Sequence, residues 1–322
     1  MDNNSDERAR QTDRFKAAVR AADNKAALEV IPFLEDADAV KKAMDLAGSK
    51  TEDVGLRVMA LQKILIAMGG NADYIRLCLS IVADPAEDGK LRDVALNVLQ
   101  TLNFSSGAFL AFRPDFAAVL RSLTDDPDTN LRTIAAETLA QNKDEFIQRK
   151  LIAGLMDPSV AILPAAKAIQ LLGYDIHAEH LPIVRSILED PATDETTKVE
   201  AVHVLASDPA AKELLTRLAL DKKQEPEVRM SSAVALSLSH SEDFLKMARP
   251  MILDDKEDES IRLVWLNALV HHQDAAAVYN DQDFLQKVSA LKASTRSPEL
   301  KKLSSRYLDN AAEHYKKTSR SN

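Results

Sequence analysis

Two histidines three residues apart are the pair in this chain whose types and spacing best suit metal chemistry. His177 and His180 flank Glu179 in the segment YDIHAEH, and residues three apart on a helix lie on one side of it. A metal centre needs further ligands, but no second pair stands at a matching position, and adjacent His271 and His272 point to different sides of a helix. We therefore assign no metal site and expect no cofactor.

Other residue types that carry chemistry lack the patterns they need. The acidic run from Asp254 to Glu259 has neither the glycine nor the alternating ligands of a calcium loop. The single cysteine, Cys78, lies in the apolar run YIRLCLSIVAD, which predicts a small buried side chain and excludes a disulfide within one chain. There is no glycine-rich phosphate loop, nucleophile elbow or Cys–His pairing. These absences predict that the chain is not an enzyme.

A helical phrase that returns about every 35 residues determines how any functional side chain is positioned. It consists of an aliphatic residue, a basic residue, then a small residue and a closing aliphatic residue at helical spacing. In chain order, the basic position holds Arg57, Arg92, Arg132, Ile162, Lys198, Arg229, Arg262 and Lys301; the small position holds Ala60, Ala95, Ala135, Ala165, Ala201, Ser232, Trp265 and Ser304; and the closing position holds Ile64, Leu99, Leu139, Ile169, Leu205, Leu236, Leu269 and Leu308. Such repetition predicts an all-α fold, a right-handed α-α superhelix (α-solenoid) of about eight helical hairpins.

Each phrase is expected to be the second helix of a pair, and an acidic turn precedes it, as at 84–85, 126–127 and 190–191. Proline cannot continue the preceding helix, and acidic side chains accept hydrogen bonds from the free N–H groups of the next one. Apolar residues at helical spacing upstream of the turns predict the first helices. These segments are 37–47, 71–83, 114–124, 144–156, 178–189, 209–220, 241–253 and 281–293.

The repeat array is expected to form one elongated domain over residues 37–310. Residues 1–36 are expected to supply N-terminal capping helices, at 10–22 and 25–35, because a terminal repeat must cover the open end of the core. The residues expected to face inward there are Phe15, Val19, Leu28 and Ile31. Residues 311–322 are expected to end the last helix and to leave a disordered tail from Lys316 to Asn322, which has too little apolar surface to order itself.

Composition limits the partners and the compartment. The net charge is −9, so duplex nucleic acid, with its dense phosphate charge, would be repelled unless a basic stripe were gathered on one face. The N-terminal segment is too charged for a signal peptide, and no apolar run reaches the roughly 18 residues of a membrane span. We expect a cytoplasmic protein without membrane contact, if Met1 is the natural start; the oligomeric state stays open.

The phrase and its turn resemble the HEAT repeat family over about residues 37–310. The resemblance is clearest in DPDTNLRTIAAETL (126–139) and in EPEVRMSSAVAL (225–236). The fourth repeat departs, because Ile162 replaces the basic residue and Pro164 lies inside the expected second helix. We expect a local kink there or a break in the ladder of basic residues. The resemblance implies a scaffold or adaptor whose second helices line the concave side. The metal-dependent hydroxylases with this fold carry paired His–Glu dipeptides, which this sequence lacks.

The basic column has a structural and a phosphate-binding interpretation. Each basic side chain follows an acidic turn closely enough to bond the carboxylate or carbonyl groups of a turn, in its own repeat or in the next. Such a ladder would lock repeat to repeat, and we favour it over phosphate binding. The residues assigned to this structural ladder are Arg57, Arg92, Arg132, Lys198, Arg229 and Arg262.

Helix geometry places another row of the phrase opposite the buried side. In chain order this row holds Gln62, Asn97, Glu137, Lys167, His203, Val234, Asn267 and Arg306. Its residue types differ from repeat to repeat, whereas those of the buried columns are nearly uniform. The row is therefore either the surface that binds a partner or ordinary solvated surface. We assign all of its members except Val234 as candidate partner-binding residues on the concave face. Flanking positions extend that surface with Asp93, Thr133, Met230, Leu263 and Lys302.

The aromatic residues leave two interpretations open. Trp265 replaces a small residue of a packed column, so either a neighbouring repeat makes room for the ring or the ring protrudes as an anchor. The segment 103–114 lengthens the spacing before one repeat and carries Phe104, Phe109 and Phe112. These rings either pack a longer loop or form an exposed hook, and packing is favoured in both cases.

We expect an interaction scaffold or adaptor that binds a protein or peptide on the concave face. The alternative is a nucleic-acid-binding or repair protein resembling the HEAT-like DNA glycosylases, whose basic groove holds an aromatic and a carboxylate at its floor. Trp265 or Phe104 near an Asp could be fitted to that role, but the acidic net charge argues against it. A lyase-type or chaperone relative is a third candidate, which no residue favours.

Overall fold

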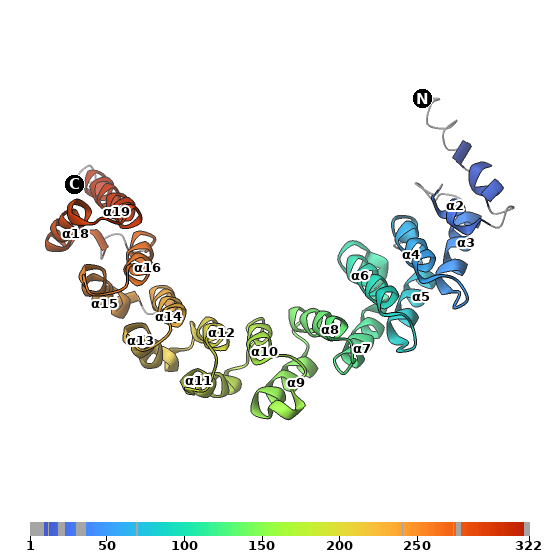
Figure 1. Cartoon of the computed structure of the whole chain (residues 1–322), viewed down its shortest axis with the longest axis horizontal. Coiled ribbons are helices and arrows are strands. Elements are labelled where there is room, and N and C mark those ends of the chain that lie inside the picture. Colours follow the sequence, from blue (N-terminus) through green and yellow to red (C-terminus); the bar gives the residue numbers. More distant parts are fainter. Residues whose placement is uncertain are drawn as a thin grey trace. The chain divides into compact units, whose positions relative to one another are not determined.

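The computed structural model describes residues 10–11, 13–18, 23–29, 37–68, 70–239, 241–272, 274 and 278–318, without the side chains of 37–39, 66–68 and 241. Every regular element in these ranges is a helix, which confirms the predicted all-α, helical-repeat fold (Figure 1). The chain forms two compact units, residues 1–147 and 148–322, and the boundary falls within helix α9. The expected division into cap, array and tail stays a prediction.

The first unit is a stack of helical hairpins. Its elements are α2 (Asn24–Glu29), α3 (Ala37–Gly48), α4 (Val54–Met68), α5 (Ala72–Ala83), α6 (Gly89–Ser105), the 3₁₀ helix η1 (Gly107–Phe112), α7 (Arg113–Leu123) and α8 (Thr129–Gln141), with α9 (Glu145–Met156) beginning at its end. Helices α3 and α4, α5 and α6, and α7 and α8 pack as pairs, and α4 also packs on α6. The expected first helices at 71–83 and 114–124 therefore match α5 and α7 closely.

The second unit repeats this arrangement. After α9 it contains η2 (Pro158–Val160), α10 (Ala165–Leu172), η3 (Ala178–His180), α11 (Leu181–Glu189), α12 (Glu195–Leu205), η4 (Pro209–Ala211), α13 (Lys212–Leu220), α14 (Pro226–Ser239), α15 (Ser241–Leu253), α16 (Glu259–Val270), α18 (Gln282–Ser294) and α19 (Pro298–Thr318). The second helices α10, α12, α14, α16 and α19 pack each on the next. They form one side of this unit, while α11, α13, α15 and α18 form the other (Figure 1). We call the former side the second-helix face.

Aspartates begin the second helices, as the acidic turns predicted. The side chain of Asp88 accepts a hydrogen bond from the backbone N–H of Lys90 at the start of α6, at 2.9 Å. Asp128, Asp194 and Asp258 cap α8, α12 and α16 in the same way. Each cap satisfies N–H groups that have no partner within their own helix and places a negative charge at the positive end of the helix dipole.

The repeated columns form the core between the helices. All closing residues from Ile64 to Leu269 are buried, and Leu308 is half-buried. The small position is likewise buried in every repeat except the fourth, where Ala165 is exposed. Small side chains at this position let neighbouring second helices approach closely, and the closing residues fill the space between them.

The fourth repeat differs from the expectation of a proline-kinked helix. Pro164 precedes α10 as its N-cap residue, so the helix is shortened to 8 residues and is not kinked. The preceding turn lies tightly against α9, because a Cβ atom on Gly154 would come within 2.8 Å of the Cα atom of Ala161. The expected kink is therefore wrong: proline excludes the residues before it from the helix, and the chain enters α10 late.

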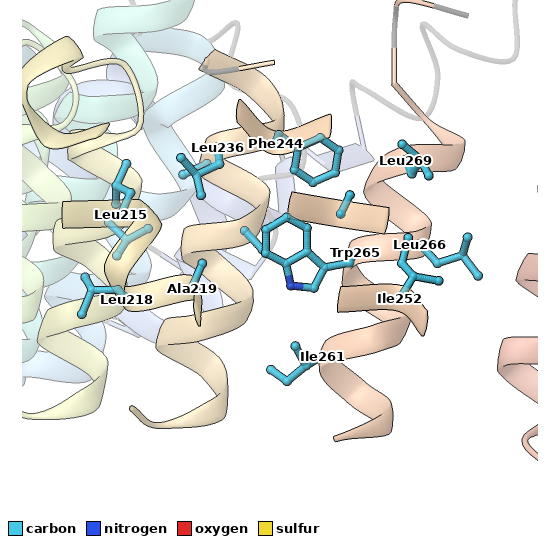
Figure 2. Close-up of a cluster of buried hydrophobic side chains, with 14 of the residues drawn as sticks. Leu215, Leu218, Ala219, Leu236, Phe244, Ile252, Ile261, Trp265, Leu266 and Leu269 are labelled. Carbon is cyan, nitrogen blue, oxygen red and sulfur yellow. The ribbon is translucent and has the colours of Figure 1, made fainter. Parts of the chain in front are cut away.

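Trp265 belongs to the core. Its side chain is fully buried, and its ring stacks on that of Phe244 with 5.2 Å between the centroids and 9° between the planes. Figure 2 shows the indole beside Phe244, with Ala219 of α13 on its other side. The neighbouring small position is Ser232, which is fully buried. Small residues in adjacent helices thus make room for the ring, and it does not protrude as an anchor.

The aromatic residues of the segment 103–114 divide between core and surface. Phe109 is fully buried and meets the ring of Phe116 edge-on, with centroids 5.5 Å apart. Phe112 is half-buried beneath the guanidinium of Arg76, which lies 5.6 Å from the ring centroid. Phe104 is 86% exposed. The expectation that the rings pack a longer loop is therefore right for Phe109 and wrong for Phe104.

The structure describes only some of the residues for which the sequence made predictions at the two ends of the chain. Phe15 and Leu28 are buried, whereas Val19 and Ile31, also expected to face inward, lie outside the described residues. Helix α19 continues through Lys316 to Thr318, further than the expected tail allowed, and residues 319–322 lie outside the described part. None of the described helices combines the length and the hydropathy that a bilayer span requires.

The closing column predicts a large difference in stability between two leucines of α14. Leu236 is fully buried and Leu238 is 76% exposed. Leu236→Ala should lower the free energy of unfolding by about 2–5 kcal/mol, because it opens a cavity between the helices. Leu238→Ala should change it by about 0.5 kcal/mol or less. Urea denaturation of both variants measures this, and equal losses would show that the helix faces are misassigned.

Candidate functional site

A groove of about 980 Å³ crosses the second-helix face of the second unit. Helix α14 contributes Val234, Ser237 and Leu238 to its lining, and α19 contributes Glu299, Lys302, Leu303 and Arg306. Helix α16 contributes Leu263, Val264, Asn267 and Ala268, and the segment after it contributes His271, His272 and Asp274. We call it the α14–α16–α19 groove. A concave, partly apolar surface with a few polar groups is the usual form of a binding site.

The groove runs obliquely over the three helices. Helix α14 contributes residues from its C-terminal half, such as Leu238, whereas α19 contributes residues from its N-terminal half, from Glu299 to Arg306. Of the residues expected to bind a partner, Asn267 and Arg306 line the groove, and so does Val234, the member of the row that was not assigned this role. The three helices therefore bring the last members of that row, although not the whole row, to one depression.

One wall of the groove is apolar. Leu238 is 76% exposed and Val234 is 42% exposed, and they lie one helical turn apart on α14. Leu263 and Val264 of α16 and Leu303 of α19 are half-buried at the floor. A large apolar side chain that is this exposed gains nothing from the fold, and an apolar surface beside a groove is characteristic of interaction sites.

The opposite wall is charged. Lys302 and Arg306 are one turn apart on α19, and both are exposed. Among the residues that the structure describes, neither forms an ion pair. Glu299 stands one turn before Lys302, in the first turn of the helix. Asn267, which is exposed on α16, supplies a neutral donor and acceptor between the two walls.

The histidines after α16 close one end of the groove. His272 lies parallel to Phe244 with ring centroids 6.0 Å apart, and its Nδ1 accepts a hydrogen bond from the backbone N–H of Asp274 at 3.1 Å. His271 is exposed. The sequence predicted that these two histidines point to different sides of a helix, but it did not connect them with a binding site.

The other members of the expected row lie away from this groove. In the first unit Gln62 and Asn97 are exposed and Glu137 is half-buried. In the second unit Lys167 donates to the side chain of Gln170 at 2.9 Å, and His203 is exposed. The flanking residues Asp93, Thr133 and Met230 are half-buried, while Leu263 and Lys302 line the groove. A binding role for the residues outside the groove stays a prediction.

Three arginines of the basic column make the same pair of contacts. The Nε atoms of Arg57, Arg92 and Arg229 donate to the carbonyl oxygen of the residue ten positions earlier, at the end of the first helix, with distances of 3.0, 3.1 and 3.4 Å. Their terminal nitrogens donate to a carboxylate in the turn of the next repeat. For Arg57 the acceptors are both oxygens of Glu87, at 2.7 and 2.8 Å. Each of these three side chains therefore joins its own hairpin to the next.

The other assigned ladder residues match this pattern only in part. Arg262 makes the first of the two contacts, since its Nε donates to the carbonyl oxygen of Ile252, ten positions earlier, at 2.9 Å. Arg132 donates to the carbonyl oxygens of Asp126 and Pro127 in its own turn, at 2.6 and 3.3 Å. Lys198 is half-buried. That the basic column as a whole holds the repeats together stays a prediction.

The buried carboxylates of these contacts are held in the charged form. The hydrogen bonds from Arg229 lower the pKa of Glu257 to about 2, although burial acts to raise it. Arg57 similarly holds the pKa of Glu87 below its ordinary value. Both side chains of the Arg229–Glu257 pair are at most 5% exposed, so the pair is shielded from solvent. Two charges that are buried together stabilise each other, while either one alone is costly.

The histidine pair of the segment YDIHAEH lies on the surface near η3. The rings of His177 and His180 stack with centroids 6.0 Å apart, and Nε2 of His180 lies 3.7 Å from Oε1 of Glu179. Within the described ranges no three His, Cys, Asp or Glu side chains are grouped so that they could hold a metal ion. Cys78 is buried, as its apolar surroundings predicted.

Comparisons with known proteins give structural neighbours only. No protein-family model matches the chain, and no curated protein matches it. Human deoxyhypusine hydroxylase in complex with glycerol is 16% identical with a TM-score of 0.32, and the match covers 78% of this chain and 99% of that chain. The complex of CpcE and CpcF of phycocyanin lyase, from a Nostoc species, is 16% identical with a TM-score of 0.36, and the match covers 80% of this chain and 94% of that chain.

These neighbours are helical-repeat proteins, as this chain is. Both are named as enzymes, which contradicts the reasoning behind the prediction that this chain is not an enzyme: the lack of familiar catalytic motifs in a stack of helical hairpins does not exclude catalysis. At this level of identity the likeness concerns the fold and does not identify a reaction or a partner.

The Arg229–Glu257 pair predicts a pH-dependent loss of stability. Because the pKa of Glu257 is depressed in the folded state, its contribution is complete above the unfolded value near 4.5 and is lost as the pH falls towards 2. Glu257→Gln should therefore destabilise the protein at pH 7 by leaving Arg229 buried without a counter-charge. The difference from the wild type should shrink steadily below pH 4.5.

Urea denaturation of both proteins over this pH range measures the difference. Asp73→Asn is a suitable control, since the exposed pair of Asp73 and Arg76 should contribute little at any pH. A loss for Glu257→Gln that does not change with pH would contradict the role assigned to the carboxylate.

Proposed function

We propose that the chain is a HEAT-like repeat protein that acts as a scaffold or adaptor and binds a protein or peptide segment in the α14–α16–α19 groove. The observation that carries this proposal is the exposed apolar wall of Val234 and Leu238 beside a groove of about 980 Å³. A side chain with 76% of its surface in water contributes to binding when a partner covers it.

The architecture supports this role. The buried columns fix the helices of the groove: α14 packs on α12 and α16, and α19 packs on α16 and α18. A site on rigid helices is largely preformed, so binding does not require ordering of the site. The groove also combines apolar floor residues with the amide of Asn267 and the charged side chains of α19, which is the mixture that protein interfaces use for affinity and specificity.

Neither of the aromatic residues considered for the nucleic-acid alternative lines the groove. Trp265 is fully buried in the core and is not in the lining of the groove. Phe104 is exposed but belongs to α6, in the first unit. The groove itself contains Glu299 and Asp274 besides its two cations, and it lacks the uniformly basic lining that phosphate binding needs.

Selection from a phage-displayed library of random peptides tests the proposal. Peptides enriched on the wild type should bind Leu238→Ser about tenfold more weakly, because the variant removes an apolar contact and adds a hydroxyl. Met156→Ser is the matched control: Met156 of the second unit is 69% exposed and does not line the groove. Isothermal titration with the selected peptides gives the dissociation constants.

Circular dichroism melting should show that both variants keep the stability of the wild type, because both positions are exposed. Equal binding by wild type and Leu238→Ser, or a library without any peptide that depends on Leu238, would refute binding at this groove.

A further inference from the structure

We infer that the occupant of the α14–α16–α19 groove is a peptide segment that is apolar at one end and acidic at the other. This inference rests on the proposed function and specifies the chemistry of the partner. In the bound state the apolar end would cover Val234 and Leu238, and a carboxylate would lie between Lys302 and Arg306.

The apolar end follows from the wall that α14 provides. The lining residues from this helix are Val234, Ser237 and Leu238, none of which carries a charge. Leu238 is the more exposed of the two apolar residues. A charged side chain placed here would lose water without gaining a partner, whereas an apolar side chain gains about 25 cal/mol for each Å² that leaves water.

The acidic end follows from the wall that α19 provides. Lys302 and Arg306 are four residues apart, so they lie on the same side of the helix with about 6 Å of rise between them. Neither has an ion pair among the described residues. The guanidinium can bind a carboxylate through two parallel hydrogen bonds, and the ammonium can add a third.

The local charge departs from that of the whole chain. The net charge of the protein is −9, and the whole lining has two carboxylates, Glu299 and Asp274, for its two cations, but the α19 wall holds two cations against Glu299 alone. Glu299 lies in the first turn of α19, where a negative charge is stabilised by the helix dipole and does not require a pairing cation. The two cations are therefore left for a partner.

A peptide suits the dimensions of the groove. The lining extends over three helices, with Asn267 of α16 between the two walls. Ser237 lies on the apolar wall, where its hydroxyl donates to the carbonyl oxygen of Val234 at 2.7 Å and can still accept a hydrogen bond. Polar side chains at such positions can hydrogen-bond to the backbone groups of an occupant, which a simple amphiphile does not have. We therefore assign a peptide segment of a partner protein in preference to a fatty carboxylate.

The peptide selection is repeated on a charge-reversed protein to test this inference. Lys302→Glu combined with Arg306→Glu should switch the enriched peptides from acidic to basic, while their apolar residues are retained. Arg296→Glu combined with Lys301→Glu is the matched control, because it makes the same change in charge at exposed positions on and just before α19 that do not line the groove. The control should enrich the same peptides as the wild type.

A selected acidic peptide with a fluorescent label then gives affinities by anisotropy. Charge reversal at Lys302 and Arg306 should weaken its binding at least about tenfold at low salt, and added NaCl should narrow the difference, because exposed charges are screened. Dodecanoate, a fatty carboxylate, serves as competitor. It should not displace the peptide.

The outcomes separate this inference from the function on which it rests. Selected peptides whose binding depends on Leu238 but which are not enriched in acidic residues would leave groove binding intact. They would overturn the inference that the occupant has an acidic end. A switch in preference on the control protein would also overturn it, since the effect would then come from general charge. Displacement by dodecanoate would overturn the assignment of a peptide, and a library without any Leu238-dependent peptide would overturn both proposals.

Discussion

The structure depends on one constraint: a helical hairpin has an apolar surface that only its neighbours in the stack can cover. Small residues at one position of each second helix allow close approach, and large aliphatic residues one turn later fill the space. Trp265 is a large residue at the small position, and small residues in the adjacent helices accommodate its ring. Since contacts between repeats satisfy this requirement, the outward side of each second helix is free to vary, and the proposed groove lies there.

Buried ion pairs add specificity to this packing. Arg57 with Glu87 and Arg229 with Glu257 have the same geometry in the two units, with the guanidinium donating both to its own hairpin and to the next. In the repeat that follows Lys198, Gln224 lies two residues before the first residue of α14, at the position where the turns before α6 and α16 have Glu87 and Glu257. Glutamate therefore accompanies arginine in these pairs. An apolar contact tolerates small rotations, but a bidentate pair fixes how one hairpin is placed against another.

The sequence predicted the helices well because their determinants are local: apolar spacing, proline and acidic caps. It failed at Pro164, since the same residue type can either kink a helix or begin one, and only the path of the chain past Gly154 decides which. It identified Asn267 and Arg306 as surface residues but not the groove that joins them, because a depression depends on the relative heights of side chains on three helices. Leu238 could have been found, as it lies one turn after Val234 on the same side of α14.

The short helix α10 has a consequence for motion within the second unit. With 8 residues it packs closely on α12, but it makes little contact with α9, the α-helix that precedes it in the chain. In a linear stack the free energy of local opening follows the area that each repeat buries with its neighbours, and cooperativity is weakest where that area is smallest. Local opening of this unit is therefore expected between α9 and α10, with α10 remaining on α12 and the hairpins that carry the groove remaining folded.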